Sequence, residues 1–124
     1  MKLIGEIVTL IPMVESDKTD FFILATQSEG SSFWYDDTQK STLTKKLFFH
    51  DWTDEYFDQT DIHGGQCFWI VVKDRRIGQV NYNQIDIQNL KTELDIIIGS
   101  ASDMGKGYGS DALRTLSNYL FSEL

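Results

Sequence analysis

The chain has 124 residues, of which 41% are hydrophobic and 13% aromatic, with one proline and one cysteine. That length and composition predict one soluble globular domain, and they exclude a disordered chain, a two-domain chain and a disulfide framework. The formal net charge is -8, which argues against nucleic-acid or anionic-membrane partners and fits a cationic partner. Acidity also serves solubility alone, so the charge leaves both interpretations open.

Targeting and metal signals are weak in this sequence. The N-terminal segment lacks the apolar core of a secretory signal, and no apolar run approaches the roughly 18 residues of a membrane span. We therefore expect a cytoplasmic protein without a membrane partner. His50 and His63 have no cysteine or second histidine at the spacing of zinc ligands, so no metal site is expected.

The first half of the chain predicts one strand and two helices. β-Branched residues over 6–11 predict a strand that stops at Pro12. Apolar residues at helical spacing predict a first helix, with Ser16 as its N-cap and Gly30 as its stop. The same spacing predicts a second helix from Thr42 to Gln59.

The segment between these helices, residues 31–41, has no clear period and is expected to be a loop. It carries the aromatic residues Trp34 and Tyr35 followed by Asp36. Large aromatic side chains on loops often face ligands. In the alternative interpretation these rings cover the core between the two helices.

The second half predicts three strands and a helix. Strand patterns cover residues 66–73, 76–85 and 93–98. The first two form a hairpin around Asp74 and Arg75, and Gly78 marks a bulge or a close backbone approach. Short connections make the three strands antiparallel. The predicted order is β-α-α-β-β-β-α, an α/β sheet domain with helices packed on it.

Glycines alternate at Gly105, Gly107 and Gly109, directly before a predicted helix over Ser110–Leu124. Glycine-rich turns that open a helix bind phosphate, because the backbone approaches the anion closely and the helix N-terminus is partly positive. The spacing does not fit the P-loop, because Lys106 is not followed by Ser or Thr. The spacing does not fit the dinucleotide fingerprint either. That motif requires an acidic residue about 20 residues further on, and the sequence ends before that position.

The segment "ELDIIIGSASDMGKGYGSDALRTLSNYLF" resembles the acetyl-CoA-binding core of the GNAT N-acetyltransferase superfamily. Residues 104–109 fill the family pattern Gln/Arg-x-x-Gly-x-Gly/Ala except at its first position, Met104. Residues 34–35, 78–82 and 93–95 further resemble aminoglycoside 6'-N-acetyltransferases and the related protein N-terminal acetyltransferases of ribosomal proteins. The resemblance implies a GNAT-like fold with a mixed, largely antiparallel sheet. It also implies truncation at the C-terminal side, because the family continues with further strands and a helix.

Acetyl-CoA is the cofactor that this resemblance implies. Backbone N–H groups of the glycine turn would hold the pyrophosphate, and the exposed edge of the strand around residues 96–98 would pair with the pantetheine amides. The implied cofactor-binding residues are Ile96, Ile97, Ile98, Met104, Gly105, Lys106, Gly107, Tyr108, Gly109 and Ser110.

Asp95 is the implied catalytic residue, because it lies on the strand that would bind the cofactor. It would accept a proton from the acceptor amine, directly or through water, or hold the ammonium. The alternatives are a pairing with Lys or Arg across the sheet, or exposure to solvent. The implied acceptor-binding residues are Trp34, Tyr35, Asp36, Tyr82 and Glu93. Cys67 alternates with apolar neighbours and is expected in the core, not as a nucleophile.

Three functions follow from the sequence. The first is acetyl-CoA-dependent transfer of an acetyl group to a primary amine of a small cationic molecule such as an aminoglycoside, and its close alternative acts on a protein N-terminus. The second is a non-catalytic CoA-binding fragment, and the third is an interaction module in which the glycine turn only links strand to helix. The strand edge left without its family neighbour also predicts a homodimer through that edge.

Overall fold

The computed structural model describes residues 1–58 and 60–124. Over these residues the strands are β1 (Leu3–Ile4), β2 (Thr9–Pro12), β3 (Gln66–Val72), β4 (Arg75–Tyr82) and β5 (Leu94–Ile98). The helices are α1 (Lys18–Gln27), α2 (Asp37–Thr42), α3 (Lys45–Phe48) and α4 (Tyr108–Glu123), with short 3₁₀ turns between them. None of the described helices has both the length and the apolarity needed to cross a membrane.

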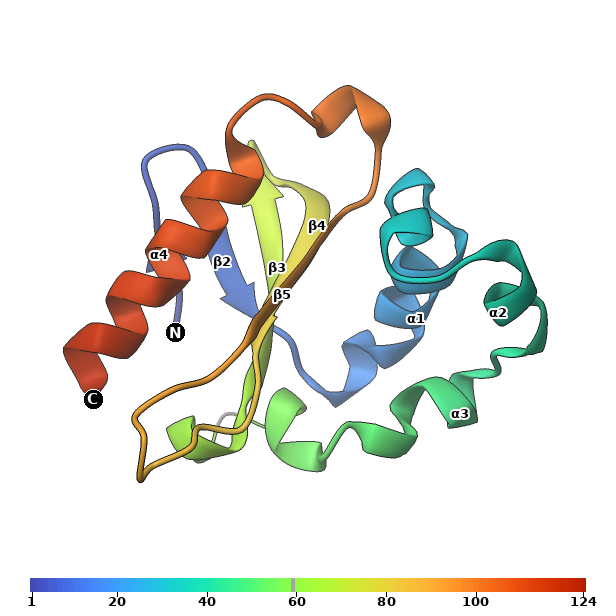
Figure 1. The fold of residues 1–124 in the computed structure, drawn as a ribbon. Coiled ribbons are helices and arrows are strands. Elements are labelled where there is room, and N and C mark those ends of the chain that lie inside the picture. Colours follow the sequence, from blue (N-terminus) through green and yellow to red (C-terminus); the bar gives the residue numbers. More distant parts are fainter. Residues whose placement is uncertain (59) are drawn as a thin grey trace.

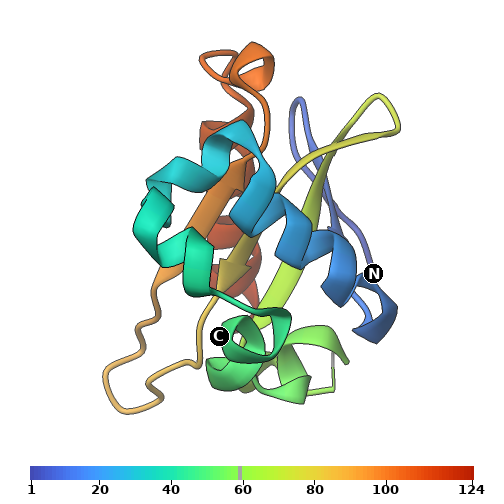
Figure 2. The ribbon, with the colours of Figure 1, turned by 90° about the vertical axis from the view of Figure 1, so that its right-hand side faces the viewer.

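The strands form one antiparallel sheet in the order β1-β2-β3-β4-β5, as the short connections predicted for its middle strands. Helix α4 covers one face of this sheet, and α1, α2 and α3 lie on the other face (Figure 1). The turned view looks onto the layer that α1 to α3 form in front of the sheet (Figure 2). The chain therefore has an α/β fold with one sheet between two helical layers.

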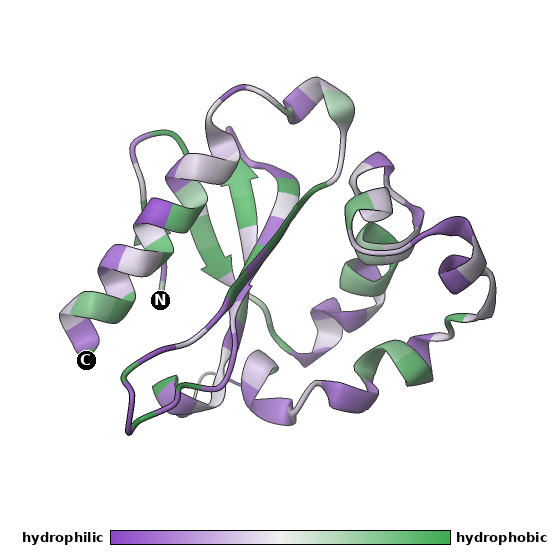
Figure 3. Ribbon diagram, in the orientation of Figure 1, coloured by the Kyte–Doolittle hydropathy of each residue, from purple (hydrophilic) through white to green (hydrophobic). Residues whose placement is uncertain are grey.

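Each face of the sheet has its own core, because successive side chains of a strand point to opposite faces. Apolar residues of β2 and β3 appear as green strands in Figure 3, and those that face α4 pack against Leu116. On the other face Phe21 is fully buried, and its ring centroid lies 5.3 Å from the centroids of both Phe48 and Trp52. The layer of α1 to α3 is thus held to the sheet largely by aromatic rings.

The predicted helix over Thr42–Gln59 is wrong as one continuous element. Its described part is broken into α3 and two 3₁₀ turns, Phe49–Asp51 and Asp54–Phe57, while Gln59 lies outside the described residues. The Thr44 side chain caps α3, and Trp52 adopts an extended backbone that ends the next turn. Packing of several aromatic rings against Phe21 and against one another outweighs the helical pattern, since aromatic residues have only moderate helix propensity.

The predicted loop over residues 31–41 is partly helical. A 3₁₀ turn covers Glu29–Phe33, and α2 begins after Asp36. The Asp36 carboxylate accepts the N–H of Gln39 at 2.7 Å, and the Gln39 side chain accepts the N–H of Asp36 at 2.8 Å. This reciprocal capping box was readable in the sequence as an acid three residues before a glutamine.

Smaller differences concern element ends. The first long strand begins at Thr9, not at residue 6, because the N–H groups of the preceding residues bond to a side chain of α4. Ser16 lies inside a 3₁₀ turn and is not the N-cap of α1. The hairpin turn is formed by Lys73 and Asp74, whose φ angles of 50° and 63° are left-handed. Both features expected at Gly78 are present: a register shift opposite Ile70 and Val71, and a backbone approach so close that a Cβ atom at Gly78 would clash with the Ile97 carbonyl.

Candidate active site

The glycine turn leaves its backbone open at the start of α4. Gly105 and Gly107 have φ angles of 74° and 82°, a region that favours glycine. A Cβ atom added to Gly105 would meet no atom within 4 Å. Asp111 is the first residue of α4 whose N–H bonds back into the turn, to the Gly107 oxygen at 3.0 Å. The N–H groups of residues 108–110 are therefore without helical acceptors, and the turn fits a phosphate.

A buried carboxylate fixes the entry to this turn. Asp103 is 3% exposed and directly precedes Met104, the first residue of the implied pyrophosphate motif. The Arg75 guanidinium donates two hydrogen bonds to it, at 2.9 and 2.8 Å. These bonds lower the pKa of Asp103 and raise the pKa of Arg75. The pair fastens the glycine turn to the start of β4.

A second buried carboxylate fixes the exit from the turn. Asp111 is 1% exposed and accepts the N–H groups of Glu6, Ile7 and Val8 at 3.2, 2.7 and 2.9 Å. Burial opposes ionisation of this group, but these N–H groups and Arg114 outweigh burial and lower the pKa of Asp111. The roles of Asp103 and Asp111 could not be predicted from the sequence, because Arg75 and the N–H groups of residues 6–8 lie far from them along the chain.

The other residues implied for the cofactor lie at the glycine turn with the start of α4, and on β5. Lys106 and Ser110 are exposed at the turn, whereas Tyr108 packs partly against the core on the α4 side. Gly109 lies in the first turn of α4, where a Cβ atom would be 3.6 Å from Ile96 Cδ1. The glycine turn and β5 thus lie close together at Gly109 and Ile96.

The outer edge of β5 differs from the free edge that we expected. The ladder with β4 directs the backbone groups of Ile96 and Ile98 outward and leaves Ile97 bonded inward. The Trp34 indole N–H donates to the Ile96 carbonyl oxygen at 3.0 Å, and Gly30 packs closely on the Ile98 carbonyl. Part of the edge is therefore occupied by the segment before α2. That leaves less backbone for the strand pairing that a dimer through β5 would need.

Asp95 points to the face opposite Ile96, toward α1 to α3. It lines a cavity of about 250 Å³ together with the rings of Trp34, Tyr35 and Trp52. We call this cavity the aromatic pocket. The Asn81 and Asn83 side-chain amides donate to Asp95 Oδ2 at 3.3 and 3.0 Å. Asp95 makes no salt bridge within the described residues, so neither alternative, a cross-sheet ion pair or simple exposure, describes its surroundings.

Other implied acceptor residues lie away from the aromatic pocket. Tyr82 is fully buried on the α4 side of the sheet, where its hydroxyl donates to the Ile62 carbonyl oxygen at 2.7 Å. Burial raises the pKa of Tyr82 well above its usual range. Asp36 is exposed and caps α2, and Glu93 is exposed just before β5. Of the five implied acceptor residues, only Trp34 and Tyr35 line the pocket beside Asp95.

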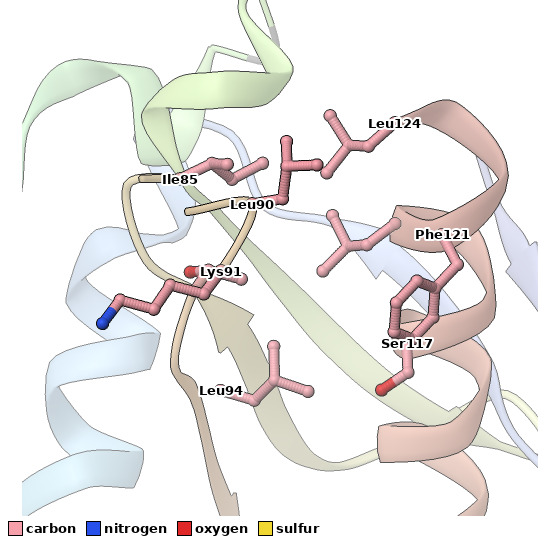
Figure 4. A pocket seen from close by; sticks show the side chains of 9 residues that line it. Ile85, Leu90, Lys91, Leu94, Ser117, Phe121 and Leu124 are labelled. Carbon is pink, nitrogen blue, oxygen red and sulfur yellow. The ribbon is translucent and has the colours of Figure 1, made fainter. Parts of the chain in front are cut away.

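A separate apolar groove lies on the other face, between α4 and the connection from β4 to β5 (Figure 4). Its volume is about 390 Å³, and its walls include Ile85, Leu90 and Phe121. It is larger than the aromatic pocket but holds none of the residues implied for catalysis or for the cofactor. Its lining is mostly apolar, and the polar side chains in it belong to Lys91, Thr92 and Ser117.

Cys67 is fully buried in the core beneath α1 to α3. Burial, with a smaller effect of the Asp95 charge, raises the pKa of its thiol well above the usual value. A thiol held neutral and away from solvent is a poor nucleophile. The expectation that Cys67 belongs to the core is confirmed.

Comparisons with known proteins agree with this geometry. The family model described as "Acetyltransferase (GNAT) domain" matches residues 8–124. No curated protein matches the chain in sequence.

Similar folds occur among solved structures. One is a probable acetyltransferase, with a TM-score of 0.69 and 22% identity, covering 99% of this chain and 68% of that one. RimL, a ribosomal L7/L12 alpha-N-protein acetyltransferase in complex with coenzyme A, has a TM-score of 0.58 and 15% identity over 96% of this chain and 67% of that one. A chimera of spermidine N-acetyltransferase SpeG from Vibrio cholerae and hSSAT has a TM-score of 0.63 and 14% identity over 93% of this chain and 63% of that one. Together with the family match over nearly the whole chain, the sheet, the glycine turn and the helix that follows it lead to one assignment: the chain belongs to the GNAT N-acetyltransferases, acyltransferases that use acetyl-CoA.

Proposed function

We propose that this chain acetylates a primary amine of a small cationic molecule, bound in the aromatic pocket beside Asp95. The observation that carries the proposal is a carboxylate that makes no ion pair within the described residues and stands among three aromatic rings. Aromatic faces attract a cation, and the carboxylate adds direct charge complementarity. The net charge of -8 favours the approach of such a molecule.

Asp95 acts on the amine in this proposal. An ammonium must lose a proton before its nitrogen can attack a carbonyl carbon, and Asp95 accepts that proton directly or through one water. The rings of Trp34 and Trp52 hold the amine next to the carboxylate and exclude bulk water.

The glycine turn and β5 hold the cosubstrate in this proposal. Acetyl-CoA would supply the acetyl group as a thioester, and its thiolate would leave and take up the second proton that the amine nitrogen loses. N–H groups of residues 105–110 bind the pyrophosphate at the positive end of α4. The space beside the Gly105 Cα atom is open, with no atom within 4 Å of the place of a Cβ atom. The outward N–H groups of Ile96 and Ile98 are suited to bind the carbonyl oxygens of the pantetheine arm and of the thioester. The Trp34 bond to Ile96 uses only the carbonyl side of this edge.

A protein N-terminal amine is the second candidate acceptor. The observation that favours it is the fold similarity to RimL, whose substrate is a ribosomal protein N-terminus. A pocket of about 250 Å³ accommodates the first residue of a peptide as readily as one aminomethyl group of a sugar.

The test combines binding and turnover. Calorimetric titration with acetyl-CoA measures cosubstrate binding. Thiol release is then measured with kanamycin, spermidine and a peptide that begins with serine. We expect turnover with at least one cationic small molecule, and Asp95→Asn should lower kcat/KM for it about 100-fold or more. Glu123→Gln, at an exposed carboxylate near the end of α4 on the other face of the sheet, is the matched control.

Two results would contradict the proposal. Turnover with the peptide alone would transfer the assignment to protein N-termini. An Asp95→Asn variant with undiminished turnover would remove Asp95 from the mechanism.

A further inference from the structure

The side chains that hold Asp95 form an ordered chain of hydrogen bonds beneath the aromatic pocket. We propose that Asn81 and Asn83 are positioning residues for Asp95 and that Tyr56 sets the direction of the Asn83 amide. The proposal rests on the role of Asp95 given above, and it concerns residues to which the resemblance assigned no role.

Both amide groups reach Asp95 from the neighbouring strand. Asn81 pairs with Asp95 across the ladder of β4 and β5, and Asn83 follows just after β4 on the same face. Their Nδ2 atoms lie 3.3 and 3.0 Å from the same carboxylate oxygen, Oδ2. The Asn83 backbone is itself fixed, because its N–H donates to the Glu93 carbonyl and its carbonyl accepts the Thr92 hydroxyl.

The direction of each amide is set by a second donor. The Tyr56 hydroxyl donates to Asn83 Oδ1 at 3.1 Å, and Gln79 Nε2 donates to Asn81 Oδ1 at 3.3 Å. Asn83 Oδ1 also accepts the Asn81 amide at 3.2 Å, so both amide oxygens are engaged by donors and each NH2 group faces the carboxylate. An amide turned by 180° would place its oxygen against the carboxylate and lose both bonds.

This arrangement uses only one oxygen of Asp95. No hydrogen bond among the described residues engages Oδ1, which is left for a ligand of the aromatic pocket. A carboxylate held through one oxygen keeps a fixed direction, which is what proton transfer from a bound amine requires.

The burial of these polar groups supports a functional reason for them. Asn81 and Gln79 are fully buried and Tyr56 is 8% exposed. Apolar side chains in these places would need no hydrogen-bond partners, whereas buried amides are costly unless they are paired. The hydrogen bonds of Gln79, Asn81 and Asn83 lead to Asp95.

The decisive comparison is between two buried tyrosine hydroxyls. Tyr56→Phe removes the bond to Asn83, and the matched control Tyr82→Phe removes a bond of similar kind on the other face of the sheet. With the best acceptor among kanamycin, spermidine and the serine peptide, we expect Tyr56→Phe to lower kcat/KM about fivefold. Tyr82→Phe should leave it within twofold, while acetyl-CoA affinity stays unchanged in both variants. Equal kcat/KM values for the two variants would overturn the proposal.

Asn83→Leu removes the donor itself and should lower kcat/KM about tenfold or more, mostly through kcat. Nuclear magnetic resonance tests the same bonds without an acceptor. In Asp95→Asn, the side-chain amide signals of Asn81 and Asn83 should shift, whereas the Asn89 signal, bonded to surface Asp86, should not. Unshifted signals would overturn the proposal.

The two proposals fail in different ways. If Asp95→Asn keeps full turnover, the role of Asp95 fails while the resonance shifts still decide whether the amides hold it. If Asp95→Asn is inactive but Tyr56→Phe and Asn83→Leu match the control, only the positioning role fails.

Discussion

Arg75 and Asp103 are joined by two parallel hydrogen bonds, Nη1 to Oδ2 at 2.9 Å and Nη2 to Oδ1 at 2.8 Å. Because Asp103 lies in the 3₁₀ turn just before the glycine turn, this fork couples the first residue of β4 to the backbone that we assign to the pyrophosphate. A fork of two bonds fixes direction as well as distance, which one lysine ammonium cannot do.

The first prediction concerns this fork. Arg75→Lys keeps the charge but loses one of the two bonds, so the glycine turn should become less ordered. We expect acetyl-CoA affinity to fall about fivefold in calorimetric titration. Arg76→Lys is the matched control, because Arg76 stacks on the Trp69 ring and pairs with Asp17, away from the turn. Equal affinities for the two variants would show that the fork does not order the turn.

The second prediction concerns Asp111. Asp111→Asn places an NH2 donor among the N–H groups of Ile7 and Val8, and should lower the free energy of unfolding at pH 7 by about 2 kcal/mol. The measurement is urea unfolding followed by circular dichroism. Asp51→Asn, at an exposed carboxylate, should change this free energy by less than about 0.5 kcal/mol.

The same unfolding measurements should depend on pH in a defined direction. The folded-state pKa of Asp111 lies below its usual value of 3.8, so its stabilising effect is present above that value and is lost as the pH falls through the lowered pKa. The difference between wild type and Asp111→Asn should therefore narrow from pH 5 toward pH 3. A difference that stays constant over this range would contradict the ionised role of Asp111.

The sequence predicted the strands and the glycine turn, whose patterns are local. It did not predict the hydrogen bonds between residues that are far apart along the chain. The strand patterns over residues 66–73 and 76–85 predicted β3 and β4 with ends within three residues, because a buried strand carries its pattern in its own side chains. The glycine turn could also be predicted, because its alternating glycines and the helix that follows them are adjacent in the sequence. Asp103 and Asp111 were missed because their partners are 28 and about 104 residues away along the chain.

Tyr82 is a residue that the sequence placed at the acceptor site and that the structure places elsewhere. Its place near the acceptor motif suggested a role in the pocket, but the alternation of β4 places it on the α4 side, with Asn81 on the pocket side. The strand period alone could have separated these neighbours, since Asp95 pairs with Asn81 across the sheet. The break of the helix predicted over residues 42–59 was not readable, because it follows from tertiary packing of aromatic rings.

The third prediction uses two glycines of the turn. Gly105→Ala introduces a side chain at a φ of 74°, which should cost about 1 kcal/mol in the free energy of unfolding. If the open space beside Gly105 holds the phosphate, the new methyl group would occupy part of it, and acetyl-CoA affinity should fall about tenfold or more. Gly109→Ala is the matched control, because it keeps the backbone N–H group that we assign to the pyrophosphate, its backbone is helical, and its Cβ atom would make ordinary contact with Ile96. Unchanged affinity in Gly105→Ala would remove this turn from the phosphate site.

The last prediction concerns Trp34, whose indole N–H bonds to the edge of β5 while its ring lines the aromatic pocket. If acetyl-CoA pairs with that edge, it changes the surroundings of the Trp34 indole, and tryptophan fluorescence should change in intensity or wavelength as the cosubstrate is added. The chain has three tryptophans, so each can be removed in turn. Trp34→Phe should abolish most of the change. Trp69→Phe, at a residue 4% exposed on β3, should preserve it. A signal that persists in Trp34→Phe would mean that acetyl-CoA binds without reaching the Ile96 edge, and the assignment of β5 to the pantetheine arm would then be wrong.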